Sequence, residues 1–98
     1  MIDINSDKEL KAFMKENETC IISFHGRYCN PCKTQKEELE KLEGVPIARI
    51  EGDSNPTICE EYMVRSIPAT FIVRDNEIQE SIVGLCRLKV LKEKLNNF

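Results

Sequence analysis

Short apolar runs alternate with charged stretches along the whole chain, and the spacing of the apolar positions predicts its elements. The first helix is marked by a capping box, in which the Ser6 hydroxyl accepts an N–H of the first turn and Glu9 reaches back to the cap. Apolar residues follow at helical spacing: Leu10, Phe13 and Met14. We therefore predict a helix with one apolar face that stops near Asn17.

The next two segments predict a buried strand and a helix. Residues 20–24 are mostly apolar and β-branched, which is typical of a central strand buried on both faces. Residues 32–43 are mostly strong helix formers, and Pro31 suits the first helical position because of its fixed φ and its missing N–H. Gly44 and Pro46 are expected to end this helix.

The second half predicts three more strands and two helices. Residues 46–50 form a strand-like run, and Asn55 followed by Pro56 is typical of a helix start, here of a short helix over residues 56–62. Two further strands, 69–73 and 78–83, are separated by Asp75-Asn76, which tolerate the positive φ of a tight hairpin. One face of a final amphipathic helix carries Leu88, Leu91 and Leu95.

This order of elements predicts an α/β fold, with residues 2–4 as a weak first strand. We expect one domain over residues 1–98, built on a central mixed sheet of four to five strands with about four helices on its two faces. Only the last two strands are joined by a tight turn. The first half of the sheet should therefore be parallel, with an antiparallel hairpin closing it.

Composition narrows the functional classes. The 14 basic residues are scattered among 17 acidic ones, so no basic stripe is present to neutralise a phosphate backbone, and we expect no nucleic-acid partner. No run approaches the ~20 apolar residues of a membrane span, and the N-terminus lacks the pattern of a signal peptide. We expect a cytoplasmic protein that does not bind membranes.

The five cysteines supply the candidate chemistry. An odd number cannot pair completely within the chain, and in a reducing compartment catalysis, redox sensing or metal binding is favoured over a structural framework. Only Cys29 and Cys32 have a motif spacing. The isolated cysteines are interpreted as small buried apolar residues: Cys20, Cys59 and Cys86.

Cys29 lies between a predicted strand and a predicted helix start, where a thiolate is stabilised. The free N–H groups and the dipole of a helix N-terminus favour an anion, so Cys29 should ionise more readily than an ordinary cysteine. Two intervening residues, Asn30 and Pro31, restrict the loop and bring Cys32 near enough to form a disulfide. The same spacing supplies half of many zinc sites, but His25 is the only histidine and no second pair follows, so we expect no metal.

Three segments in the same order resemble the thioredoxin family over nearly the whole chain. Residues 23–33 resemble its active-site segment, with an aromatic residue before the first cysteine and Pro-Cys-Lys at the end. Residues 62–70 are similar to the segment that carries the family's cis-proline, and residues 83–84 resemble its glycine before the last helix. This resemblance implies a thioredoxin fold and a thiol–disulfide oxidoreductase.

The resemblance also implies roles for individual residues. Cys29 would attack the substrate disulfide and Cys32 would resolve the mixed disulfide, with the Cys29–Cys32 disulfide as the only redox group and no other cofactor. The Ile67–Pro68 bond would be cis and face the sulfurs. An apolar rim for protein substrates would comprise Tyr28, Ile67, Gly84 and Leu85. The implied partners are protein disulfides and a flavoenzyme of the thioredoxin reductase type, and we expect a monomer.

The chain departs from the family pattern around the motif. Ser23 occupies the position of a buried Asp that helps to move the proton of the second cysteine, and Arg49 stands where a Lys is common. Glu51, on the same strand face as Arg49, either substitutes for that Asp or simply pairs with Arg49. His25 replaces a Trp, either as a cation that stabilises the thiolate or as a packing residue.

Two alternatives therefore stay open beside a disulfide reductase. The loss of the buried Asp favours a redox-sensing or redox-inactive thioredoxin-like binding module, whereas the retained cysteines and prolines count against it. A glutaredoxin-like enzyme that uses glutathione is disfavoured by Pro31-Cys32-Lys33 and by the aromatic Tyr28.

Overall fold

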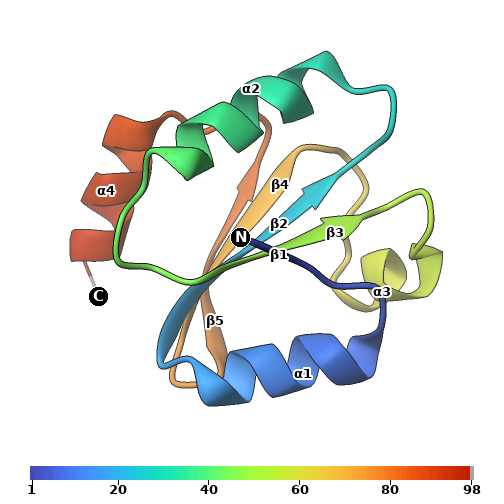
Figure 1. Ribbon diagram of the computed structural model, residues 1–98, viewed down its shortest axis with the longest axis horizontal. Coiled ribbons are helices and arrows are strands. Elements are labelled where there is room, and N and C mark those ends of the chain that lie inside the picture. Colours follow the sequence, from blue (N-terminus) through green and yellow to red (C-terminus); the bar gives the residue numbers. More distant parts are fainter. Residues whose placement is uncertain (98) are drawn as a thin grey trace.

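The computed structural model describes residues 1–97, which fold around a five-stranded mixed sheet (Figure 1). In chain order the elements are β1 (Ile2–Asp3), α1 (Asp7–Glu16), β2 (Thr19–His25), α2 (Asn30–Glu40), β3 (Ile47–Glu51), α3 (Pro56–Glu61), β4 (Ala69–Arg74), β5 (Glu77–Val83) and α4 (Leu88–Asn96). The strand order is β1-β3-β2-β4-β5. β1, β3 and β2 are parallel, whereas β4 is antiparallel to both β2 and β5. The predicted α/β fold with an antiparallel closing hairpin is confirmed.

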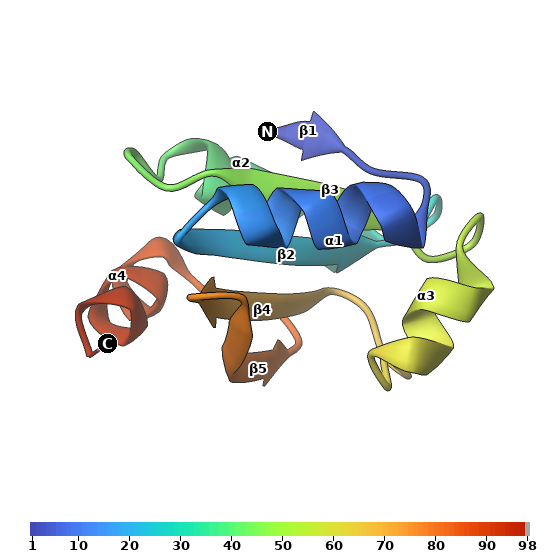
Figure 2. The ribbon, with the colours of Figure 1, turned by 90° about the horizontal axis from the view of Figure 1, so that it is seen from below.

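The sheet has helices on both faces, with α1 and α3 on one side and α2 and α4 on the other (Figures 1 and 2). Alternate residues of β2 enter two apolar clusters. Cys20, Ile22 and Phe24 join the cluster beneath α1 and α3, while Ile21 joins the cluster beneath α2 and α4. Because both faces of β2 are buried, its sequence is a continuous apolar run instead of an alternating one.

The start of α1 follows the predicted capping box. The Ser6 hydroxyl accepts the Glu9 N–H at 3.1 Å and donates to the Glu9 carboxylate. The predicted hairpin turn is also present, with φ values of 53° at Asp75 and 66° at Asn76. Among residues 1–97, no helix combines the length and the apolar character needed to cross a membrane.

Two local predictions were wrong. Pro31 occupies the second helical position of α2, because Asn30 is already helical. This helix ends at Glu40 and not at residue 43. The residues that follow it leave the helical path, and Leu42 and Val45 pack against the apolar cluster beneath α2 and α4. Asn55 is the N-cap residue of α3 and Pro56 begins the helix, as predicted, but within residues 1–97 the Asn55 side chain makes no capping hydrogen bond, and its amide donates to the Glu51 carbonyl oxygen at 2.9 Å.

Candidate active site

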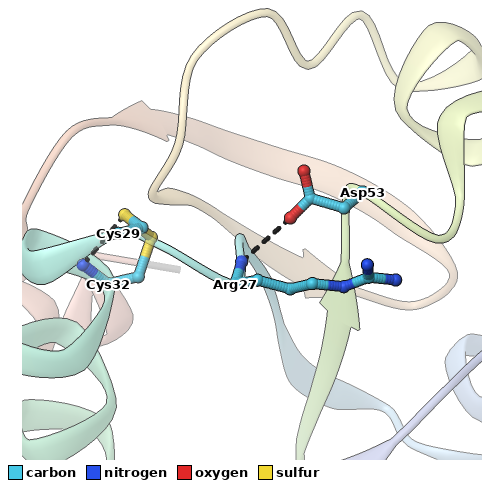
Figure 3. The surroundings of a disulfide bond; sticks show 4 residues. All are labelled: Arg27, Cys29, Cys32 and Asp53. Carbon is cyan, nitrogen blue, oxygen red and sulfur yellow. Dashed lines mark hydrogen bonds between the residues drawn. A yellow bond between two sulfur atoms is a disulfide. The ribbon is translucent and has the colours of Figure 1, made fainter.

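Cys29 and Cys32 lie where β2 leads into α2, and they form a disulfide with their Cα atoms 5.2 Å apart (Figure 3). Cys29 is the N-cap residue of α2, and its Sγ accepts the Cys32 N–H at 3.2 Å. The sulfur thus takes the place that a Ser or Asp oxygen usually fills at a helix start. Cys32 is buried and Cys29 is partly exposed. A partner molecule can therefore reach Cys29, while Cys32 is shielded behind it.

The predicted cis-proline segment lies beside the sulfurs. The Ile67–Pro68 peptide bond is cis, and the Pro68 carbonyl oxygen accepts the Gly84 N–H at 2.8 Å. Gly84 has a φ of +85°, a conformation that L side chains rarely adopt, which explains the glycine before the last helix. Of the predicted apolar rim, Tyr28 is fully exposed and Ile67 and Leu85 are partly exposed.

Gly26 brings the disulfide, the cis-proline segment and an acidic loop together. A Cβ on this residue would overlap Ile67 Cδ1, and it would lie 3.4 Å from Asp53 Oδ2 and 3.8 Å from Cys29 Cβ. Three side chains therefore converge on the space that a side chain at this position would fill. A side chain at position 26 would therefore displace the end of the Ile67 side chain, whereas the backbone conformation of Gly26 is open to other residues.

Arg27 and Asp53 are site residues that the sequence reasoning missed. The Asp53 carboxylate accepts the Arg27 N–H at 2.9 Å, next to the disulfide (Figure 3). The guanidinium group of Arg27 also donates to Glu51 at 3.1 Å and to Ser54 at 2.8 Å. These bonds fasten the segment before Cys29 to the loop that follows β3. The sequence held only a partial signal: Arg27 and Asp53 each follow a predicted strand, and the carboxyl ends of neighbouring parallel strands meet at the same edge of a sheet, but which side chains meet there depends on the two loops.

Neither interpretation of Glu51 agrees with the structure. Its carboxylate binds Arg27 and Ser54, and these hydrogen bonds, that of Ser54 first, lower the pKa of Glu51. Arg49 instead approaches Asp3, at 4.0 Å, because β1 lies beside β3. Glu51 is thus held by Arg27 and Ser54 at the end of β3 and does not pair with Arg49.

Ser23 lies at the centre of a polar row across the sheet. It is opposite Arg49 on β3 and opposite Thr70 on β4, on the face that α2 covers. Ser23 and Thr70 are both buried, and within the described residues 1–97 Thr70 Oγ1 and Arg49 Nε have no hydrogen-bond partner. A hydroxyl at position 23 cannot exchange a proton as a carboxylate does near neutral pH. The row is therefore polar without a titrating acid.

Burial shifts the pKa values of His25 and of the three free cysteines in the direction that favours their neutral forms. Burial first, and then the charge of Arg49, lower the pKa of His25, which favours the packing interpretation of this residue. Burial raises the pKa of Cys20 to about 11 and also raises the pKa of Cys59 and Cys86. Cys20 and Cys86 are buried as predicted, whereas Cys59 is only partly buried. Residues 1–97 contain no group of three or more His, Cys, Asp or Glu side chains suited to hold a metal ion.

Comparisons with known proteins agree with this geometry. A family model described as Thioredoxin matches residues 2–97. A thioredoxin from Chlamydia caviae is 30% identical over 89 residues, which cover 87% of this chain and 86% of the relative. A thioredoxin from Pyropia yezoensis is 26% identical over 90 residues, covering 87% and 84%. The solved structure of a mutant thioredoxin from Halobacterium salinarum has a TM-score of 0.94 at 25% identity, covering 99% of this chain and 88% of that one.

Proposed function

Because the chain belongs to the thioredoxin family and is a thiol–disulfide oxidoreductase, we propose that it reduces disulfides of other proteins, with Cys29 as the nucleophile and Cys32 as the resolving thiol. One observation carries the proposal: Cys29 Sγ caps α2 and accepts the Cys32 N–H. A backbone donor and the positive end of the helix dipole favour the thiolate, which is the reactive form.

The proposed exchange has two steps. In the first, the Cys29 thiolate attacks one sulfur of the substrate disulfide, the S–S bond breaks, and the second substrate sulfur leaves with the electron pair and takes a proton. In the second, Cys32 loses its proton and attacks Cys29 Sγ, and the first substrate sulfur leaves as a thiolate. The substrate gains two electrons and the Cys29–Cys32 pair is oxidised to the disulfide.

A reductant must then return the pair to the dithiol. We propose a flavoenzyme of the thioredoxin reductase type as the electron donor, with the cysteine pair as the only redox group of a monomer that acts in the cytoplasm. This proposed location agrees with the direction of the reaction, because a compartment that keeps thiols reduced would supply the electrons that each cycle consumes.

Insulin reduction tests the proposal. With dithiothreitol as electron donor, the wild-type protein should accelerate the precipitation of insulin chains, and Cys29→Ser should abolish the acceleration. Cys32→Ser should instead accumulate a mixed disulfide on Cys29, visible by mass spectrometry. A glutaredoxin-like enzyme would require glutathione in place of dithiothreitol, and a binding module would not accelerate the reaction with either thiol.

A further inference from the structure

On the face of the sheet that α1 and α3 cover, the edge strand β5 is left exposed. α1 lies in front of β2 and β3 (Figure 2), and the residues of β4 on this face, Ala69, Phe71 and Val73, are buried in the apolar cluster. β5 contributes no residue to the described apolar cluster on this face. A groove of about 860 Å³ runs there, between the segment after α3 and the strands β4 and β5. A groove with apolar walls at the open edge of a sheet is typical of a binding surface.

A β-bulge aims a side chain of β5 into this groove. Ile78 lies opposite Val73 and Glu80 lies opposite Ile72. These two residues of β4 are adjacent, so Gln79 of β5 is an extra residue without a partner in the register. Directly opposite residues share a face, so the bulge places Ile78 on the same side as Val83. Without it, strict alternation from Val83 would put Gln79 there. Ile78 is 43% exposed and Val83 is 73% exposed.

Met63 reaches the groove from the other wall at the cost of backbone strain. It follows the C-cap residue of α3 with a φ of 57°, a position where glycine is usual. Its side chain is 75% exposed and lines the groove. A strained residue that displays a flexible apolar side chain to solvent indicates function, and methionine adapts well to partners of different shape.

The groove begins beside the reacting sulfurs. Val83, at one end, lies opposite Ala69, and the next residue binds the Pro68 carbonyl oxygen through its N–H. Ile67 links this end of the groove to the disulfide, because Ile67 Cδ1 and Cys29 Cβ both lie close to the position that a Cβ on Gly26 would take. A polypeptide whose sulfur has reached Cys29 therefore has the groove directly beside it.

We propose that this groove binds an extended, apolar segment of the substrate protein next to its disulfide, as a specificity surface separate from the dithiol. The proposal rests on the proposed function, because it takes a protein disulfide as the substrate. Among residues 1–97, β5 pairs only with β4, so its other edge is available to hydrogen-bond an added strand while apolar side chains enter the groove.

Two substitutions test the groove without touching the cysteines. Met63→Gly removes the side chain and relieves the positive φ, so the variant should fold at least as well as the wild type. Ile78→Thr keeps a β-branched residue in the strand. The matched control is Val90→Thr, an exposed apolar residue of α4 on the opposite face. Each pre-reduced protein is mixed with insulin or with cystine, and its oxidation is followed by alkylation and mass spectrometry.

We expect the second-order rate constant for insulin to fall about fivefold in each groove variant, as for the loss of a half-buried apolar side chain. The rate constants for cystine, and both rate constants of Val90→Thr, should stay unchanged. Wild-type rates with insulin in both groove variants would overturn the inference, as would equal losses with both substrates. If sedimentation shows a wild-type dimer that Met63→Gly separates, the groove joins two copies and the inference also fails. Failure of the wild type to react with insulin would instead overturn the proposed function.

Discussion

Replacing Thr70 with valine should stabilise the protein, because no other group of residues 1–97 forms a hydrogen bond with the buried Thr70 hydroxyl. The residue is 0% exposed, and its Oγ1 accepts and donates no bond within that part of the chain. Burying an unpaired hydroxyl costs about 1–3 kcal/mol, and valine has nearly the same shape without that group. Valine is also favoured in strands. We expect the free energy of unfolding to rise by about 1–2 kcal/mol.

Urea unfolding measures this change. The midpoint should rise with an unchanged slope, and the melting temperature should rise by roughly 4–8 °C for each kcal/mol gained. Thr70→Ser is the control, since it keeps the hydroxyl but removes a buried methyl group and should lose about 1 kcal/mol. A neutral or destabilising Thr70→Val would refute the reasoning, because it would mean that the hydroxyl makes a bond in solution.

Three further substitutions or treatments address the site. Asp53→Asn keeps an acceptor for the loop but removes a negative charge near the disulfide, so reduced Cys29 should ionise at a lower pH than in the wild type; titration of thiolate absorbance measures it, and an unchanged titration would contradict it. Burial raises the pKa of Cys20 to about 11 in the folded protein, whereas the ordinary value, expected in the unfolded chain, is 9.0. The free energy of unfolding should therefore decline as the pH rises from 9.0 to about 11, and Cys20→Ala should flatten that decline in urea unfolding series measured at different pH values. Gly26→Ala should slow insulin reduction by roughly tenfold, because the new methyl group displaces Ile67 beside the disulfide and misplaces the bound substrate; equal rates would show that Ile67 moves aside freely.

The architecture could be predicted because most elements are marked by residues close together in the sequence. The run at residues 20–24 and the turn at Asp75-Asn76 determine the central strand and the closing hairpin, and both depend on neighbours in sequence. The end of α2 could not be predicted from propensity. Leu42 and Val45 pack against residues far along the chain, and this tertiary contact outweighs the helix-forming residues before Gly44.

The candidate active site likewise has a part that could be predicted from the sequence and a part that could not. The cysteine pair and the cis-proline are marked by local motifs, and their geometry could be anticipated. The partners of Glu51 could not, because its strand position indicated Arg49 on the same face, whereas the loop after β3 turns Glu51 toward Arg27. Asp53 was missed because its position beside the disulfide depends on how two loops meet.

The sulfur that caps α2 makes electron transfer and helix stability two measures of a single interaction. Whatever the Cys32 N–H contributes to holding a thiolate on Cys29, that thiolate contributes equally to anchoring the first turn, because linked equilibria are reciprocal. An electrophile that reacts with this sulfur therefore removes both the nucleophile and the N-terminal cap of α2. Thermal melting of the reduced chain, with and without such a reagent, becomes a readout of nucleophile strength that needs no substrate.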